Sequence, residues 1–321
     1  MNTMNVFIDP LLFLQFIREI TGGIFNEFFL TCTVYGEAPV LLFLISIIYW
    51  CIHKKTGEFL FLAMTWAGVV NSFVKITACI YRPWVMDPRV HPVEEAMPKA
   101  TGYSFPSGHT ANATSFFGGL TLKCNFSKAI TAVLCLCILL IGFSRNYLGV
   151  HSVPDVICAF IVTLILLLIV KKVFDRLDEK PDFDLAIAAA GIIASALILI
   201  YATVKSYPVD YDSAGKLIVD PAKMILDSFR YSGVLCGFSV SWIIEKRFID
   251  FSVDGNLKDK LMRIICGFIA IELIETVLIP IGKANGPAGW FLGYFIMMVF
   301  IIVIMPLAIK YLQNNPDSNS I

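Results

Sequence analysis

Residues 129–170 read AITAVLCLCILLIGFSRNYLGVHSVPDVICAFIVTLILLLIV, two apolar runs joined by a short polar turn. Each run, 129–147 and 153–170, approaches the roughly 20 apolar residues that a helix needs to cross a bilayer. Polar and charged side chains gather around the turn: Ser144, Arg145, His151 and Asp155. The stretch predicts two membrane-spanning helices with a polar cluster where they meet.

The rest of the chain repeats this apolar pattern. Of its 321 residues, 57% are hydrophobic and 16% are charged, and the mean hydropathy is +0.76. Soluble domains carry about 25% charged residues, so this composition favours a membrane protein and excludes disordered and collagen-like chains. Nine stretches are candidate spans: 36–53, 58–80, 107–122, 129–147, 153–170, 184–204, 223–243, 261–282 and 288–312. We therefore expect an all-helical, multi-pass bundle of about nine spans.

The first 35 residues differ from the stretches that follow. Asp9, Arg18 and Glu19 interrupt the apolar residues of 1–21, which lack the basic start and clean apolar centre of a signal peptide. An interfacial amphipathic helix fits this composition, while 24–35 either lengthens the first span or forms a separate bend. We expect three parts: an N-terminal interfacial segment (1–35), a membrane core with all the motifs (36–180) and additional transmembrane helices of the same domain (181–321).

The charge balance and the cysteines exclude other classes. Net charge is zero, from 25 Lys and Arg against 25 Asp and Glu, so the chain lacks the basic footprint of a nucleic-acid-binding protein. The nine cysteines lie in or beside apolar stretches, and none forms a C-x-x-C pair. We interpret them as small core or lipid-facing residues rather than metal ligands or a disulfide framework.

The distribution of Lys and Arg predicts the orientation. With residue 54 on the cytoplasmic side, that side carries fourteen basic residues and the opposite side carries ten. This assignment places four polar clusters together on the outer side: Lys75 with Arg82-Pro83, Pro106-Ser107-Gly108-His109, Ser144-Arg145, and His151 with Asp155. Because the motifs were not used to assign the topology, their agreement supports a shared pocket near the outer surface.

Such a pocket suits a phosphate group. Arg82 and Arg145 can each bind two phosphoryl oxygens, and Lys75 adds a point charge. Ser107 and Gly108 open a helix, where free backbone N–H groups and the helix dipole favour an anion and glycine permits close approach. Phosphoryl transfer requires mostly positioning and charge stabilisation, which this set supplies.

Two histidines can divide the chemistry. Asp155 lies one helical turn after His151, so its carboxylate can hold one imidazole nitrogen as N–H and leave the other free to attack phosphorus. His151 would then form a phosphohistidine. His109, beside the anion site, would protonate the leaving alcohol and then activate water. This chemistry requires no metal or other cofactor.

The spacings K-x6-R-P, P-S-G-H and S-R-x5-H-x3-D, in this order over residues 75–155, resemble the signature of the type 2 phosphatidic acid phosphatase superfamily. That superfamily includes lipid phosphate phosphatases, undecaprenyl pyrophosphate phosphatases, glucose-6-phosphatases and vanadium haloperoxidases. The resemblance implies metal-free hydrolysis through a phosphohistidine. It assigns phosphate binding to Lys75, Arg82, Ser107, Gly108 and Arg145, and the roles of acid/base, nucleophile and orienting carboxylate to His109, His151 and Asp155. The region after 184 is extra relative to many bacterial members.

We therefore expect a membrane phosphatase acting on a lipid phosphate or polyprenyl pyrophosphate, with membrane lipids around it. The resemblance suggests a bacterial plasma membrane, with the site on the periplasmic or extracellular face. A small soluble phosphate ester is the rival substrate, since glucose-6-phosphatases are also described with nine spans. A catalytically silent lipid-binding or transport protein would need neither histidine. Vanadate-dependent oxidation is disfavoured because the relatives with that activity are soluble.

Overall fold

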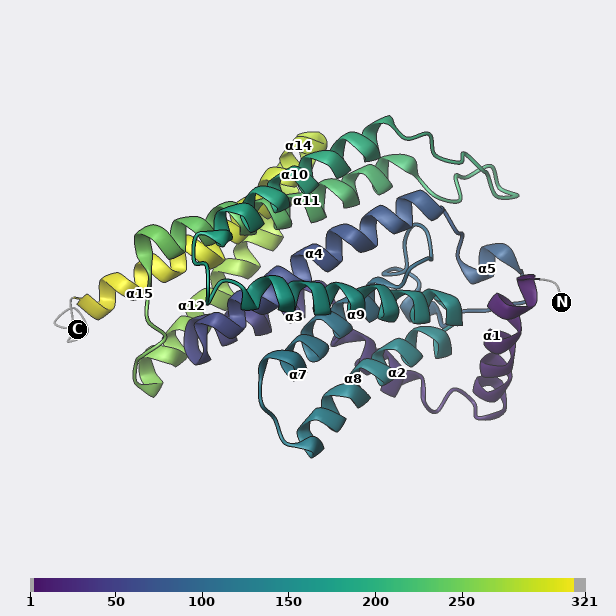
Figure 1. Cartoon of the computed structure of the whole chain (residues 1–321). Coiled ribbons are helices and arrows are strands. Elements are labelled where there is room, and N and C mark those ends of the chain that lie inside the picture. The colour runs from purple at the N-terminus through teal and green to yellow at the C-terminus, as the bar shows by residue number, and fades with distance from the viewer. Residues whose placement is uncertain (1–2, 315–321) are drawn as a thin grey trace. The chain divides into compact units, whose positions relative to one another are not determined.

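The computed structural model describes residues 3–314, which are helical apart from their loops and one antiparallel bridge between Tyr211 and Leu217 (Figure 1). The α-helices are α1 (Thr3–Ile20), α2 (Asn26–Val34), α3 (Ala38–Ile47), α4 (Lys54–Ala78), α5 (Pro83–Met86), α6 (Gly108–Ala113), α7 (Gly119–Lys123), α8 (Lys128–Tyr147), α9 (Val153–Asp175), α10 (Phe183–Val204), α11 (Pro221–Ile244), α12 (Leu257–Leu273), α13 (Ile279–Ala284), α14 (Gly286–Val299) and α15 (Met305–Asn314). Short π-helical turns extend several of them, including Ile48–Ile52 after α3 and Glu245–Ile249 after α11.

All nine stretches expected to span the membrane are helical in the described residues. Six helical segments are long and apolar enough to cross a bilayer: Lys54–Met86, Lys128–Tyr147, Val153–Asp175, Phe183–Val204, Leu257–Ala284 and Gly286–Asn314. A further span is formed if the bent pair Asn26–Val34 and Ala38–Ile52, whose halves meet at 51°, crosses as one. The other two stretches correspond to the short run from α6 to α7 and to α11, which carries Asp227 and Arg230. The expected all-helical, multi-pass membrane bundle is confirmed.

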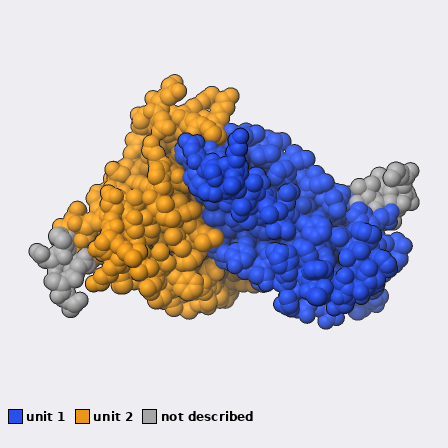
Figure 2. Space-filling view, turned by 90° about the horizontal axis from the view of Figure 1, so that it is seen from below, with its two compact units in different colours: residues 1–41, 70–169, 204–224 blue, residues 42–69, 170–203, 225–321 orange. Residues whose placement is uncertain are grey.

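The chain divides into two compact units (Figure 2). Unit 1 comprises residues 1–41, 70–169 and 204–224, and unit 2 comprises 42–69, 170–203 and 225–321. Helices α4, α9 and α11 contribute residues to both units. The three parts proposed from the sequence (1–35, 36–180 and 181–321) follow the motifs rather than the packing and remain a prediction, and their ends at 1–2 and 315–321 lie outside the described residues.

Apolar side chains cover the outward faces of the long helices. On α9, Ile157, Ile161, Ile165 and Leu168 recur at helical spacing, and each is about half exposed. An apolar stripe of this size on a soluble protein would mark an interaction surface, whereas in a multi-pass protein it faces lipid. The inward faces pack the core and position the polar helix ends.

Helix α1 is attached to unit 1 through one of its faces. Ile8 and Leu11 are buried against Val90, while Phe13 and Phe16 on the same helix are more than half exposed. Arg18 donates hydrogen bonds to the carbonyl oxygens of Tyr147, at 3.0 Å, and His91. This two-faced packing is compatible with the interfacial position that the sequence predicts for the segment.

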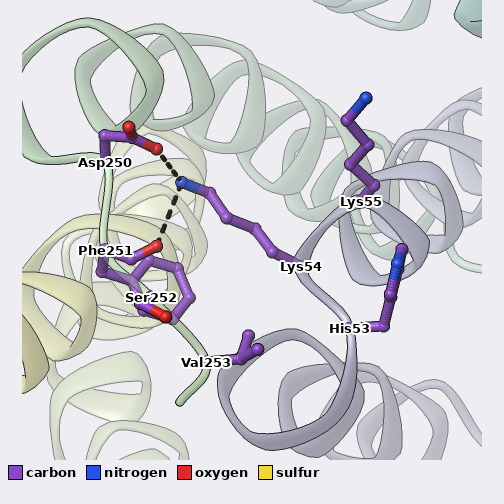
Figure 3. A pocket seen from close by; sticks show the side chains of 7 residues that line it. All are labelled: His53, Lys54, Lys55, Asp250, Phe251, Ser252 and Val253. Carbon is purple, nitrogen blue, oxygen red and sulfur yellow. Dashed lines mark hydrogen bonds and ion pairs between the residues drawn. The ribbon is translucent and has the colours of Figure 1, made fainter.

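Unit 2 contains a buried ion pair at the start of α4. The Lys54 ammonium lies 2.8 Å from a carboxylate oxygen of Glu245, whose side chain is fully buried. It also lies 2.8 Å from Asp250 (Figure 3). Its bond to Asp250 lowers the pKa of that carboxyl group. Lys54 and Asp250, but not Glu245, border a pocket of about 400 Å³. Lys54 therefore compensates a carboxylate that has no access to water.

We predict that Lys54→Met lowers the free energy of unfolding by about 3 kcal/mol, because Glu245 would be left as an uncompensated buried charge. Lys55→Met is the matched control: the Lys55–Asp178 pair, at 2.9 Å, is exposed on both sides and should contribute less than about 1 kcal/mol. Denaturation of the detergent-solubilised variants measures both changes. Equal losses in the two variants would contradict the assigned role of Lys54.

Candidate functional site

The sequence-predicted site residues lie at the ends of four helices of unit 1 and in the loops beside them. Lys75 is in the last turn of α4, Arg82 precedes α5, Ser107 caps α6, Gly108 and His109 begin α6, Arg145 is in the last turn of α8, His151 lies between α8 and α9, and Asp155 is in the first turn of α9. The hydrogen bonds below bring most of them into one cluster.

His151 and Asp155 face each other inside this cluster. The Nδ1 atom of His151 lies 3.3 Å from the Oδ2 atom of Asp155, and both side chains are almost fully buried. The hydroxyl of Ser104 donates to the same carboxylate oxygen at 2.5 Å and lies 3.3 Å from His151 Nδ1. The backbone N–H of Ser152 also donates to this oxygen, at 2.7 Å. The Oδ2 atom of Asp155 is thus contacted by three groups: the His151 Nδ1 atom, the Ser104 hydroxyl and the Ser152 N–H.

The opposite nitrogen of His151 indicates which tautomer is present. Its Nε2 atom lies 3.0 Å from Nη1 of Arg82. Because a guanidinium only donates hydrogen bonds, Nε2 must accept and therefore carries a lone pair. In the neutral ring, the proton then resides on Nδ1, which faces the carboxylate. This is the tautomer that a nucleophilic Nε2 requires.

One loop, residues 101–106, surrounds two of the cations with carbonyl oxygens. Arg82 donates to Thr101, Gly102 and Val150 at 3.0, 3.1 and 2.8 Å. Lys75 donates to the carbonyl oxygens of Tyr103, Ser104 and Pro106 at 2.9, 3.1 and 2.9 Å. These bonds compensate the buried charges and fix the loop that leads into the P-S-G-H motif.

The P-S-G-H motif forms the start of α6. Ser107 caps the helix by accepting hydrogen bonds from the backbone N–H and the hydroxyl of Thr110, at 3.4 and 2.9 Å. The Ser107 N–H donates to the carbonyl oxygen of Asp155 at 3.1 Å, which joins α6 to α9. A Cβ atom on Gly108 would meet only Asn71, at 3.9 Å, so the backbone is approachable there.

His109 points an unsatisfied atom into the protein. Its Nε2 atom is buried and has no hydrogen-bond partner within residues 3–314. Arg145, His151 and Arg82 all lie close enough to act on it electrostatically. The ring therefore belongs to the same cluster, and its Nε2 atom has no hydrogen-bond partner among the described residues.

The N-terminal segment contributes residues that the sequence analysis missed. Thr33 of α2 accepts a short hydrogen bond from the Arg145 guanidinium, which is 1% exposed. Gly36 lies against His109: a Cβ atom built on it would be 3.1 Å from His109 Cβ and 2.7 Å from Ile141. Neither residue, nor Ser104, forms a recognisable motif with its neighbours. Only their folded positions reveal them.

Burial controls the protonation of the central histidine. It lowers the pKa of the His151 imidazole, and the positive charges of Arg82, Arg145 and Lys75 lower that pKa further. The ring is therefore neutral at neutral pH, as an attacking nitrogen must be. No three His, Cys, Asp or Glu side chains among the described residues are arranged to hold a metal ion.

We predict that Gly36→Ala lowers kcat about tenfold, because the added methyl group must displace either the His109 ring or the buried Ile141 side chain. Gly22→Ala is the control, because its surroundings are open even though its φ of 59° disfavours alanine. Phosphate release by the purified variants, together with their melting temperatures, separates loss of activity from loss of folding. Full activity in Gly36→Ala would show that this contact does not position His109.

Comparisons with known proteins place these motifs in a family context. Residues 58–179 match the PAP2 superfamily, and residues 229–315 match the transmembrane extension of PAP2 superfamily phosphatases. The chain is similar to lipid phosphate phosphatase delta of Arabidopsis thaliana, with 25% identity over 175 residues that cover 51% of this chain and 42% of the relative. No solved structure gives a significant match.

Two microbial proteins are also similar to this chain. Phosphatidylglycerophosphatase B of Bacillus subtilis is 30% identical over 167 residues, which cover 48% of this chain and 76% of the relative. Undecaprenyl-diphosphatase of Sulfolobus acidocaldarius is 30% identical over 109 residues, 34% of this chain and 50% of the relative. The matches thus span about half of the plant and archaeal proteins and three quarters of the Bacillus protein. Together with the two matched regions, they show that the chain belongs to the PAP2 superfamily.

Proposed function

We propose that the chain is an integral membrane phosphatase that hydrolyses a phosphomonoester or diphosphate of a lipid or polyprenyl substrate, through a phosphohistidine and without a metal. The observation that carries this proposal is the arrangement of His151. One nitrogen faces Asp155 and Ser104, the other accepts from Arg82, and two further cations, Lys75 and Arg145, act on the ring electrostatically.

In the first step, the Arg82 N–H group that faces His151 Nε2 turns to a phosphoryl oxygen, which frees the Nε2 lone pair. Nε2 then attacks the phosphorus atom and the bond from phosphorus to the leaving oxygen breaks. The electron pair of that bond goes to the leaving oxygen, which takes a proton from His109. His109 enters this step as the imidazolium, because the negative charge of the bound phosphate favours the protonated ring. Lys75, Arg82 and Arg145 stabilise the phosphoryl oxygens, and the free N–H groups at the start of α6 add to this effect. Asp155 stabilises the positive charge that develops on His151.

In the second step, water attacks the phosphohistidine. His109, now neutral, accepts a proton from the water, the bond from phosphorus to Nε2 breaks, and inorganic phosphate leaves. The electron pair returns to His151, which regains its starting tautomer. The unpartnered Nε2 atom of His109 supports this double role, because it is free to exchange a proton with either oxygen.

The relatives and the membrane setting support a proposal for the class of substrate. The names of the relatives give their substrates as lipid phosphate, phosphatidylglycerophosphate and undecaprenyl diphosphate, and the chain itself is a multi-pass membrane protein. We therefore propose a lipid-linked substrate that enters sideways from the bilayer. The excess of Lys and Arg on the side of residue 54 supports a site that opens to the outer face of a bacterial plasma membrane.

We predict that the purified protein releases phosphate from at least one of phosphatidic acid, phosphatidylglycerophosphate, undecaprenyl diphosphate, sphingosine phosphate and glucose-6-phosphate, with or without EDTA. His151→Ala should lower kcat by a factor on the order of 10³ or more, because it removes the attacking nitrogen. His53→Ala, in unit 2, is the control and should retain activity.

The results of this panel distinguish the proposed function from its alternatives. Preference for glucose-6-phosphate would favour the soluble-ester alternative. A folded protein that releases no phosphate from any substrate would favour a binding or transport role. Inhibition by EDTA, or activity in His151→Ala, would contradict the proposed mechanism.

We predict that the acid limb of kcat/KM that reports His151 lies below pH 6.5. A lowered pKa means that the imidazole stays neutral, and nucleophilic, as the pH falls through the ordinary histidine range. Arg82→Gln should move this limb toward higher pH, because it removes the positive charge beside Nε2. Ionisation of the substrate phosphate is common to both enzymes, so the difference isolates His151. A limb that stays at the same pH in Arg82→Gln would contradict the assignment.

A further inference from the structure

A fourth cation lies at the rim of the candidate site. The Lys99 ammonium is 2.6 Å from a carboxylate oxygen of Glu37, and the two side chains are 60% and 20% exposed. By contrast, Arg82 and Arg145 are 6% and 1% exposed. Lys99 is therefore the cation of this group that solvent, or a protruding part of a substrate, reaches most readily.

Two contacts place this ion pair on the side of His109. Gly36, the residue before Glu37, packs against the His109 ring and accepts a hydrogen bond from Asn112 at 3.1 Å. Lys99 is close enough to His109 to act on it electrostatically, as Glu37 is to Arg145. The ion pair thus borders the part of the site where the proposed mechanism places the leaving oxygen.

Packing and hydrogen bonds fix the backbone that follows Lys99. Ala100 is buried in one cluster with Leu148 and Val150, between the motif residues Arg145 and His151. The following carbonyl oxygens, those of Thr101 and Gly102, accept from Arg82. The position of Lys99 is therefore coupled to the phosphate-binding arginine, although its side chain points to the rim.

We propose that Lys99 binds a second phosphate group of the substrate, the one that remains on the leaving group. This inference rests on the proposed function and deepens it: the chain prefers substrates with two phosphate groups over monoesters of the same lipid. Glu37 holds the ammonium in place, and because an ammonium has three donors, Lys99 can keep this partner and still bind phosphate oxygens.

The chemistry explains why a cation is useful at this point. When His151 attacks the terminal phosphorus of a diphosphate, the bond to the bridging oxygen breaks and its electron pair goes to a lipid monophosphate. Negative charge therefore grows on the leaving phosphate beside His109. A lysine there stabilises this charge, whereas an alcohol leaving group offers it no anion.

The test compares two pairs of substrates. Farnesyl diphosphate and farnesyl phosphate differ only in the second phosphate, whereas phosphatidylglycerophosphate differs from phosphatidic acid by an added glycerol phosphate, which makes its inner phosphate a diester. For each pair we divide kcat/KM for the substrate with two phosphate groups by kcat/KM for the substrate with one. We expect Lys99→Gln to lower this ratio about tenfold. The pair with the larger effect identifies whether the second group is a directly linked phosphate or a phosphodiester.

Two further variants separate a binding role from a structural one. Arg89→Gln is the matched control, since Arg89 is also an exposed loop cation paired with a carboxylate, Asp87 at 2.7 Å, and it should leave the ratio unchanged. Glu37→Gln should lower the ratio less than Lys99→Gln does, because Lys99 keeps its charge and the glutamine oxygen can still accept a hydrogen bond from the ammonium. A fall in Glu37→Gln equal to that in Lys99→Gln would show a structural ion pair and overturn the inference.

The proposed function and this inference fail in different ways. If the folded wild-type protein releases phosphate from none of the four probes and from no other substrate of the panel proposed above, the phosphatase assignment is rejected. If it releases phosphate and the ratio is the same in Lys99→Gln as in the wild type, only the role of Lys99 is rejected.

Discussion

The candidate site depends on keeping three cations charged inside a helical membrane protein. A buried charge is strongly unfavourable unless hydrogen bonds compensate it. Arg82 and Lys75 obtain most of this compensation from the carbonyl oxygens of one loop, residues 101–106, and Arg145 obtains part of it from Thr33. The loop cannot move without uncovering a charge, so the cations hold the P-S-G-H motif in place. The proposed phosphate binding and the local fold thus use the same electrostatic arrangement.

The sequence was sufficient to predict those features that depend only on residues close to one another in the chain. Apolar runs of bilayer length predicted the helices, because lipid leaves backbone polar groups only internal partners. The pair His151 and Asp155 was predicted from one helical turn of spacing, and the start of a helix at Ser107 and Gly108 from the P-S-G-H motif. Each inference needed only a few neighbouring residues and the geometry of a single helix.

Contacts between distant segments could not be predicted in this way. Ser104 lies 47 residues from His151 in the chain, and Thr33 lies 112 residues from Arg145. The spacing of apolar residues along a helix does not indicate which distant atom a serine or threonine hydroxyl will contact. The division into two units was equally hidden, because α4, α9 and α11 each read as one continuous helix in sequence.

The N-terminal segment bears on how members of one superfamily can differ. The matched regions, 58–179 and 229–315, contain the motif residues but not residues 26–37. Yet Thr33 contacts Arg145, Gly36 packs on His109, and Glu37 holds Lys99 at the rim. A segment outside the matched regions therefore touches Arg145, His109 and Lys99. Under the proposed function, changes in such a segment would alter which leaving group is accepted, while the residues proposed to handle the scissile phosphate remain the same.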